Sequence, residues 1–181
     1  TVADVVPLLD ENRVITYHGL KVMNDKPRLA IQVLKSLKKV EIITSRTLAF
    51  QFGPLLNAAG RLKDADMAVR FLLSNERLEA EEMAQILDST NAERREKESE
   101  MIQTALKLAD EQKNNPALVL ISPEFHQGVN GIVATRLVES FYKPVLLLSE
   151  NEGKLKGSGR SIPELNLKEV LSDCSDLLER F

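Results

Sequence analysis

Glycine, serine and arginine come together in the segment GSGRS, residues 157–161. The Arg160 guanidinium is a planar fork that can bind a phosphate through two hydrogen bonds, and the Ser158 hydroxyl adds a donor beside it. Gly157 and Gly159 can adopt backbone angles that turn successive N–H groups inward, which would form a nest for an anion. The spacing matches neither a Walker loop nor a dinucleotide-binding fingerprint. The segment predicts either a phosphate site or a hairpin end with a solvated arginine.

A second group of candidate residues lies in HQGVNGIVATRL, residues 126–137. His126 precedes Gly128 and Gly131 at the predicted start of a helix, where free N–H groups can receive an anion that the glycines allow to come close. The alternative is structural, with glycines that let the helix pack closely on a strand and a histidine without a chemical role. The spacing alone leaves both interpretations open.

Two segments near the N-terminus carry further polar candidates. Asn57 and Arg61 stand in GPLLNAAGRL, where a tight turn would present an amide and a guanidinium, and a helix kink with an exposed arginine is the alternative. Asp4 stands among apolar neighbours in TVADVVPL. A carboxylate in such a setting is costly unless it is paired, caps a helix or binds a metal, and capping is the commoner role.

Composition excludes several classes of protein. The 181 residues contain one cysteine and two histidines, which excludes an internal disulfide and a cysteine-based zinc site and favours a reducing, cytoplasmic setting. No apolar run approaches the length of a membrane helix, and no signal-peptide pattern is present. The net charge of −3 gives no global attraction to nucleic acid, although a local basic groove remains compatible with it. The first residue is Thr1 rather than Met, as in a piece of a longer chain.

The first part of the chain is predicted to be helical. Apolar residues recur at helical spacing in residues 11–24, 27–37 and 65–75, whereas Gly53, Pro54 and Gly60 predict a loop or a broken helix between them. Residues 78–112 contain no glycine or proline and predict one helix about 50 Å long. Its charged middle, ERREKESE, indicates a helix that bridges two bodies and is solvated between them.

The pattern changes after Pro116. ALVLIS and PVLLLS are typical of buried strands on either side of a helix, GKLKGSGRS predicts a third strand, and NLKEVLSDCSDLLERF predicts a closing helix. We therefore predict an α/β chain, α+β overall, in which a helical N-terminal part and a long connecting helix precede a small α/β lobe with a partly parallel sheet.

Taken in order, these segments resemble the RecJ family of single-strand-specific 5′→3′ DNA exonucleases, within the DHH/DHHA1 phosphoesterase superfamily. The resemblance rests on TVADVVPL, GPLLNAAGRL, NAERREKE, HQGVNGIVATRL and KGSGRS, and covers Thr1 to about Ser161. It implies a nuclease of DNA repair and recombination, with a two-metal Mn²⁺ or Mg²⁺ site in a DHH lobe and a DHHA1 lobe that grips single-stranded DNA. A helicase and a single-strand-binding protein are implied partners, and no membrane is involved.

The resemblance also implies roles for individual residues. Asp4 matches a metal ligand of the DHH lobe, and His126 matches a histidine near the scissile phosphate and is the catalytic candidate. The substrate and phosphate contacts expected from the family motifs are Asn57, Arg61, Gly157, Ser158, Gly159 and Arg160. The expected division is residues 1–12 as the tail of the DHH lobe, 13–77 as a helical region, 78–113 as the connecting helix and 115–181 as an incomplete DHHA1 lobe.

The sequence departs from the family pattern in ways that bear on activity. It contains no DHH motif and no paired-aspartate motif, and it ends before the expected GGHxxAAG motif. We therefore expect an internal fragment that contacts the strand and is inactive alone. Two alternatives stay open: part of a DHHA1 oligoribonuclease or cyclic-dinucleotide phosphodiesterase, and a non-catalytic module that binds single-stranded nucleic acid.

Overall fold

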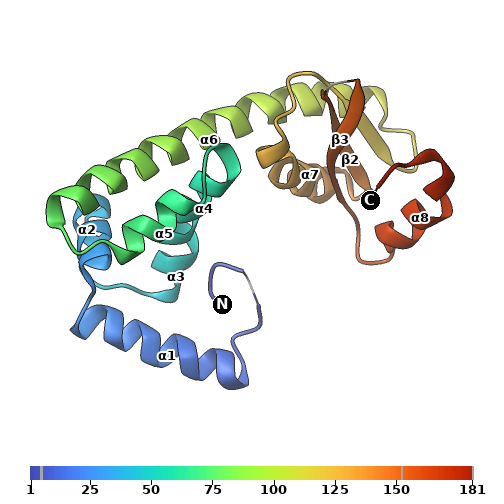
Figure 1. Ribbon diagram of the computed structural model, residues 1–181. Helices are drawn as coiled ribbons and strands as arrows, with labels where there is room; N and C mark the ends of the chain where they lie inside the picture. The colour runs from blue at the N-terminus through green and yellow to red at the C-terminus, as the bar shows by residue number, and fades with distance from the viewer. Residues whose placement is uncertain (5, 152, 181) are drawn as a thin grey trace. The chain divides into compact units, whose positions relative to one another are not determined.

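The computed structural model describes residues 1–4, 6–151 and 153–180. The chain divides into two compact units, Thr1–Arg94 and Arg95–Phe181. The long helix α6, Arg77–Glu111, contributes residues to both units (Figure 1). Within the described residues, no helix is long and apolar enough to cross a membrane.

The first unit consists of several short helices and the first part of α6 (Figure 1). In chain order these are α1 Asp10–Asp25, α2 Leu29–Lys38, α3 Ser45–Thr47, the π-helical turn η1 Leu48–Phe52, α4 Gly53–Leu62 and α5 Asp66–Leu73. Their core contains Leu34 of α2, Phe52 of η1, Leu55 of α4, Phe71 of α5 and Leu87 of α6, all almost fully buried. Burial of such large side chains is the main source of stability for a helical unit of this kind.

Helix α4 corrects the expectation of a loop or a broken helix around GPLLNAAGRL. Residues Gly53–Leu62 form one unbroken helix. Pro54 lies in the first turn, where the backbone N–H that proline lacks has no intrahelical partner. Gly53 is required by packing, because a Cβ there would lie 2.8 Å from the Leu48 carbonyl oxygen and 3.1 Å from the Ala3 Cβ.

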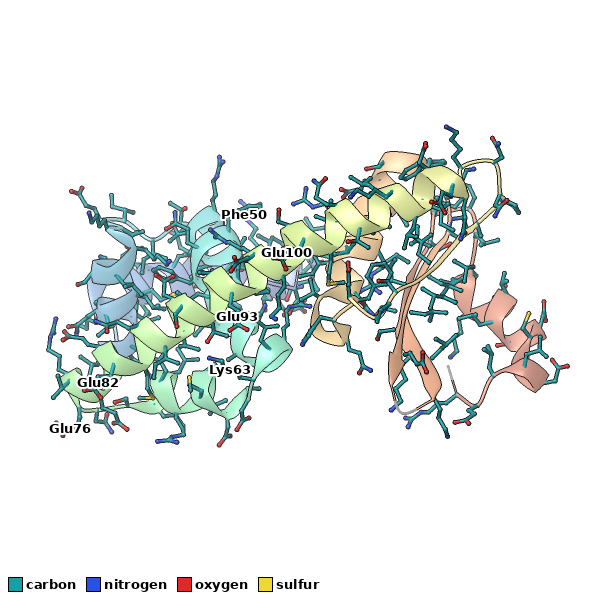
Figure 2. All side chains as sticks on the ribbon, turned by 90° about the horizontal axis from the view of Figure 1, so that it is seen from above. Phe50, Lys63, Glu76, Glu82, Glu93 and Glu100 are labelled. Carbon is teal, nitrogen blue, oxygen red and sulfur yellow. The ribbon has the colours of Figure 1, made fainter. Side chains whose placement is uncertain are left out.

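Helix α6 confirms the long helix expected over residues 78–112, with bounds at Arg77 and Glu111. The expectation of a solvated charged middle is only partly met. Glu93 and Glu100 of this segment lie on the helix (Figure 2) and are exposed, but Arg94 is buried. The Arg94 Nε atom donates a hydrogen bond of 3.2 Å to the Asn91 Oδ1 atom, which keeps the buried amide oxygen satisfied.

The second unit is a small α/β layer with the predicted mixed sheet. Its elements are β1 Leu118–Ile121, α7 Gln127–Phe141, β2 Val145–Asn151, β3 Lys154–Arg160, α8 Leu167–Asp173 and the 3₁₀ turn η2 Ser175–Leu177. The strand order is β1-β2-β3, and β2 pairs in parallel with β1 and antiparallel with β3. The parallel pair needs a crossover, which α7 supplies.

One face of this sheet is buried. Leu118 and Leu120 of β1 and Val145 and Leu147 of β2 are almost fully buried. The free edge of β1 is covered by a side chain: the Gln112 amide donates to the Val119 carbonyl oxygen at 2.9 Å and accepts from the Val119 N–H at 3.0 Å. Such a pair of bonds replaces those of a missing neighbouring strand.

The closing helix is shorter than the sequence predicts. Helix α8 ends at Asp173, and the turn η2 follows from Ser175 to Leu177. Asn166 caps the start of α8 by accepting a hydrogen bond of 3.2 Å from the Lys168 N–H. None of the residues Leu167–Asp173 is buried, so packing contributes little to extending this helix.

Candidate nucleic-acid interface

Strand β3 gathers polar side chains on one of its faces. Because successive side chains of a strand point to opposite sides, Lys154, Lys156, Ser158 and Arg160 share a face. The register pairs Ser158 with Leu147 and Arg160 with Val145. These partners are buried, so the polar face of β3 continues the buried face of the sheet at its edge. The Lys154 Nζ atom is paired with a Glu179 carboxylate oxygen at 2.8 Å. Lys156, Ser158 and Arg160 add two cations and a hydroxyl that can bind the backbone of a polyanion.

The Arg160 side chain turns toward helix α7. Its Nη1 atom donates a hydrogen bond of 2.7 Å to the Gly159 carbonyl oxygen. Its Nη2 atom lies 2.9 Å from the place that a Cβ of Gly131 would occupy. The guanidinium is therefore held at the end of β3, beside the first turns of α7, and remains exposed there.

The glycines of GSGRS do not form the expected nest. Gly157 and Gly159 lie in the extended strand β3, and Gly153 is the glycine with positive φ in the described residues. The reason for glycine is steric. A Cβ at Gly157 would lie 1.8 Å from the Leu147 carbonyl oxygen, and one at Gly159 would lie 2.6 Å from the Leu167 Cδ2 atom. Their contact with phosphate, expected from the family motif, stays a prediction.

His126 forms the N-cap of α7. Its ring Nδ1 atom accepts a hydrogen bond of 3.2 Å from the Gly128 N–H. The backbone N–H of His126 donates to the Met101 Sδ atom, with 3.3 Å between nitrogen and sulfur. A ring nitrogen that accepts has no proton, so the neutral imidazole carries its proton on Nε2. The cap thus fixes both the tautomer and the direction of the ring.

A cavity of about 430 Å³ lies beside His126 within the second unit. Its wall combines charged, apolar and sulfur-containing side chains from α6 and from the loop before α7: Lys97, Glu100, Met101, Pro123, Glu124, Phe125 and His126. The Thr104 Oγ1 atom donates to a Glu124 carboxylate oxygen at 2.8 Å, which anchors the loop to α6. The His126 ring therefore borders a hollow of ligand size.

The candidates of the first unit lie on and around α4. Asn57 and Arg61 are exposed and one helical turn apart, which places them on the same face. The N-terminal segment contacts the start of the same helix, since Ala3 lies against Gly53. Asp4 is 74% exposed, and its Oδ2 atom lies 3.1 Å from the Thr1 amino nitrogen. It lies outside the apolar environment that the neighbouring residues suggested.

The described residues do not form a metal centre of their own. No group of three or more histidine, cysteine, aspartate or glutamate side chains converges anywhere in residues 1–4, 6–151 and 153–180. A two-metal site needs several carboxylate or imidazole ligands, and Asp4 alone is a single donor. The donor set of the described residues therefore does not fit the Mn²⁺ or Mg²⁺ pair that the resemblance implies.

The sequence predicted the polar candidates but did not reveal Asn130 or the contact of Gly131 with Arg160. In the second unit, Gly131 of α7 lies against the Arg160 guanidinium of β3, and His126 caps the start of the same helix. Asn130 is fully buried and its Nδ2 atom donates to the Leu147 carbonyl oxygen at 3.4 Å, opposite Ser158. An asparagine inside an apolar helical stripe was the available signal for this contact.

The comparisons with known proteins agree over the whole chain. The chain is 41% identical to the single-stranded-DNA-specific exonuclease RecJ of Bacillus subtilis, and the match covers all of this chain and 24% of that protein. It is 41% identical to RecJ of Haemophilus influenzae, covering 94% of the chain and 31% of that protein. The chain thus spans about a quarter to a third of the curated relatives it matches. No family model matches it.

Solved structures give the same result. The crystal structure of RecJ in complex with Mg²⁺ from Thermus thermophilus superposes with a TM-score of 0.87 at 35% identity, covering 99% of this chain and 28% of that one. A crystal structure of exonuclease RecJ bound to manganese gives a TM-score of 0.85 at 34% identity, covering 99% and 45% respectively. Fold and sequence therefore identify the same relatives.

Proposed function

Because this chain belongs, as a segment, to the RecJ family, we propose that it is the strand-binding part of a single-stranded-DNA exonuclease. The observation that carries the proposal is the row of Lys154, Lys156, Ser158 and Arg160 on one face of β3. Arginine and lysine neutralise phosphates, whereas base stacking would need aromatic side chains, which make up only 4% of this chain. We therefore infer that this face binds the sugar-phosphate backbone of the DNA single strand.

Ser158 and Arg160 receive a terminal phosphate in this proposal. They are two residues apart on the same face of β3, about 7 Å along the strand, so a hydroxyl and a guanidinium can reach one group together. Among the described residues, the Arg160 guanidinium donates one hydrogen bond, to the Gly159 carbonyl oxygen, which leaves most of its N–H groups for a ligand. Gly157 and Gly159 contribute by letting the strand lie close to β2 and α8.

His126 acts at the reacting phosphate. With Nδ1 occupied by the Gly128 N–H, the Nε2–H group is the donor available to a phosphate oxygen. Asn57 and Arg61 hold another part of the phosphate backbone from α4. The proposed functional division is residues 1–12 as the tail of the DHH lobe, 13–77 as a helical region, 78–113 as the connecting helix and 115–181 as an incomplete DHHA1 lobe.

Metal chemistry belongs to the parent protein. The solved relatives are complexes with Mg²⁺ and Mn²⁺, and such ions activate water and stabilise charge on a phosphate. In our proposal Asp4 contributes one ligand and the rest come from outside this chain. The chain alone should therefore not cleave 5′-phosphorylated single strands with Mn²⁺, and measured cleavage would refute this part of the proposal.

The wider role is the one that the family implies, namely strand processing in DNA repair and recombination in the cytoplasm, with a helicase and a single-strand-binding protein as partners. No residue of this chain is assigned to those partners. The alternatives of an oligoribonuclease, a cyclic-dinucleotide phosphodiesterase or a non-catalytic module are less favoured, because relatives named as RecJ match across the chain.

Fluorescence anisotropy with a labelled single strand tests this function. Arg160→Ala and Arg61→Ala should each weaken binding and reduce its salt dependence by about 0.7 in the slope of log K against log salt. Arg13→Ala is a matched control, since Arg13 is an exposed arginine of α1 and its loss changes the net charge equally. Equal effects of the three substitutions would refute the assigned contacts and leave only general electrostatics.

A further inference from the structure

We propose that Gly131 is a positioning residue for Arg160. The missing side chain of this glycine leaves the place on α7 in which the guanidinium lies, and so sets the direction from which Arg160 meets a phosphate. The inference rests on the proposed function of Arg160 and goes beyond it, because it assigns specificity to a residue without a polar side chain.

The contact distances carry the inference. A Cβ built on Gly131 would lie 2.9 Å from the Arg160 Nη2 atom, 3.5 Å from Cζ and 3.9 Å from Nη1. Non-bonded carbon contacts are favourable at about 3.5–4.0 Å, so a methyl group and the guanidinium cannot both occupy this place. Any residue larger than glycine at this position moves the arginine head.

The fold itself tolerates a side chain at Gly131. The atoms that a Cβ would meet all belong to the far end of Arg160, a long side chain that can rotate away. Gly131 lies inside α7, where alanine favours the helix over glycine by about 1 kcal/mol. The Thr135 Oγ1 atom donates to the Gly131 carbonyl oxygen at 3.0 Å, a backbone contact that alanine retains. Gly131→Ala therefore separates the position of the guanidinium from the stability of the unit.

A hydrogen bond to β3 limits how the Arg160 guanidinium can respond when it is displaced from Gly131. Its Nη1 atom is bound to the Gly159 carbonyl oxygen at 2.7 Å, so the guanidinium is held by β3 while it lies in the space beside Gly131 of α7. Filling the space beside Gly131 changes the orientation of the planar guanidinium but keeps its charge. A point charge still attracts a strand, whereas two parallel hydrogen bonds to one phosphate need the fork in place.

The first measurement follows the arginine itself. In two-dimensional ¹H–¹⁵N NMR spectra of the 181-residue chain, the Nε–Hε signal of Arg160 is assigned by its loss in Arg160→Lys. Gly131→Ala should shift this signal. Gly19→Ala is the matched control, because Gly19 also lies inside a helix and a Cβ there meets no atom within 4 Å. An Arg160 signal that stays in place in Gly131→Ala overturns the inference, whatever DNA binding does.

The second measurement is a double-mutant cycle on DNA binding. The readout is the ratio of affinities for 5′-phosphorylated and 5′-hydroxyl single strands of one sequence. Gly131→Ala should lower this ratio, by at most the roughly tenfold expected for the loss of a hydrogen bond to a charged group, with the salt slope unchanged. In the Arg160→Ala background the same substitution should have no further effect.

The outcomes separate the inference from the function on which it rests. An equal effect of Gly131→Ala with and without Arg160 overturns the positioning role, and so does an unchanged ratio in Gly131→Ala when Arg160→Ala lowers it. An unchanged ratio in Arg160→Ala refutes the proposed phosphate contact and removes the binding role of Gly131 with it. A shifted NMR signal together with a ratio that falls only in the presence of Arg160 supports the inference.

Discussion

The imidazole of His126 and the backbone of Gly128 are joined by a hydrogen bond of 3.2 Å from the Gly128 N–H to the His126 Nδ1 atom. This bond caps α7 and directs the ring. Loss of a capping side chain costs about 1 kcal/mol, and asparagine is among the best caps. We therefore expect His126→Ala to lower the free energy of unfolding by about 1 kcal/mol and His126→Asn to leave it nearly unchanged.

Urea denaturation of the two variants checks this expectation, and exonuclease assays of the same variants in a full-length RecJ separate capping from chemistry. Both variants should lose activity there, because neither has the Nε2–H group. Full activity of His126→Asn would reduce His126 to a structural cap.

The glycines of β3 should differ in their tolerance of alanine. A Cβ at Gly157 meets the backbone carbonyl of Leu147 at 1.8 Å, so β2 and β3 must separate to admit it. The closest atoms to a Cβ at Gly159 are the ends of the Leu167 and Leu146 side chains, which can rotate. We expect Gly157→Ala to cost about 3 kcal/mol or more and Gly159→Ala about 1 kcal/mol, measured by thermal unfolding. The reverse order would contradict the strand geometry.

These glycines also show where the sequence was insufficient. Residue types alone suggested an anion nest, because glycine permits positive φ. The actual reason is the carbonyl of Leu147 and the side chain of Leu167, which come from other elements. Neither neighbour can be identified from the local sequence.

The elements themselves were more predictable than their contacts. The absence of glycine and proline over residues 78–112 was sufficient for α6, and the apolar runs ALVLIS and PVLLLS were sufficient for the parallel strands. Pro54 misled the prediction, since it lies in the first turn of α4 rather than inside the helix. Burial of Arg94 and contact of Arg160 with Gly131 depend on tertiary packing and leave no periodic signal.

The side-chain amide of Gln112 should protect the edge of the sheet. It makes two hydrogen bonds with the backbone of Val119, one in each direction. Gln112→Leu removes both and should cost about 1–3 kcal/mol, while Gln112→Glu keeps an acceptor for the Val119 N–H and should cost less. Chemical denaturation gives these values. Sedimentation should also show more self-association for Gln112→Leu, because an uncovered strand edge pairs with other chains; equal behaviour of both variants would contradict this role.

The hydroxyl of Tyr142 should lose its proton at a higher pH than an ordinary tyrosine does. The hydrogen bond from its hydroxyl to the Glu164 Oε1 atom, 2.7 Å long, raises the pKa of Tyr142 above its usual value, with desolvation and the charge of Glu164 adding to the effect. A raised folded pKa means that this bond stabilises the fold below about pH 10 and that the stabilisation is lost as the pH rises through the folded pKa.

Absorbance at about 295 nm, where tyrosinate absorbs, measures this pKa during alkaline titration, and Tyr142→Phe identifies its component. Glu164→Gln should lower the pKa of Tyr142, because it removes the charged acceptor. An unchanged or higher pKa in Glu164→Gln would show that the carboxylate has no part in the shift.

The most direct test of the central claim is the affinity of the unsubstituted chain for single strands that differ only at the 5′ end. Competition binding at fixed salt compares a 5′-phosphorylated oligonucleotide with its 5′-hydroxyl counterpart. If Ser158 and Arg160 receive the terminal phosphate, the phosphorylated strand should bind about tenfold more tightly, and Arg160→Ala should abolish the difference. Equal affinities of the two strands for the unsubstituted chain would contradict the claim.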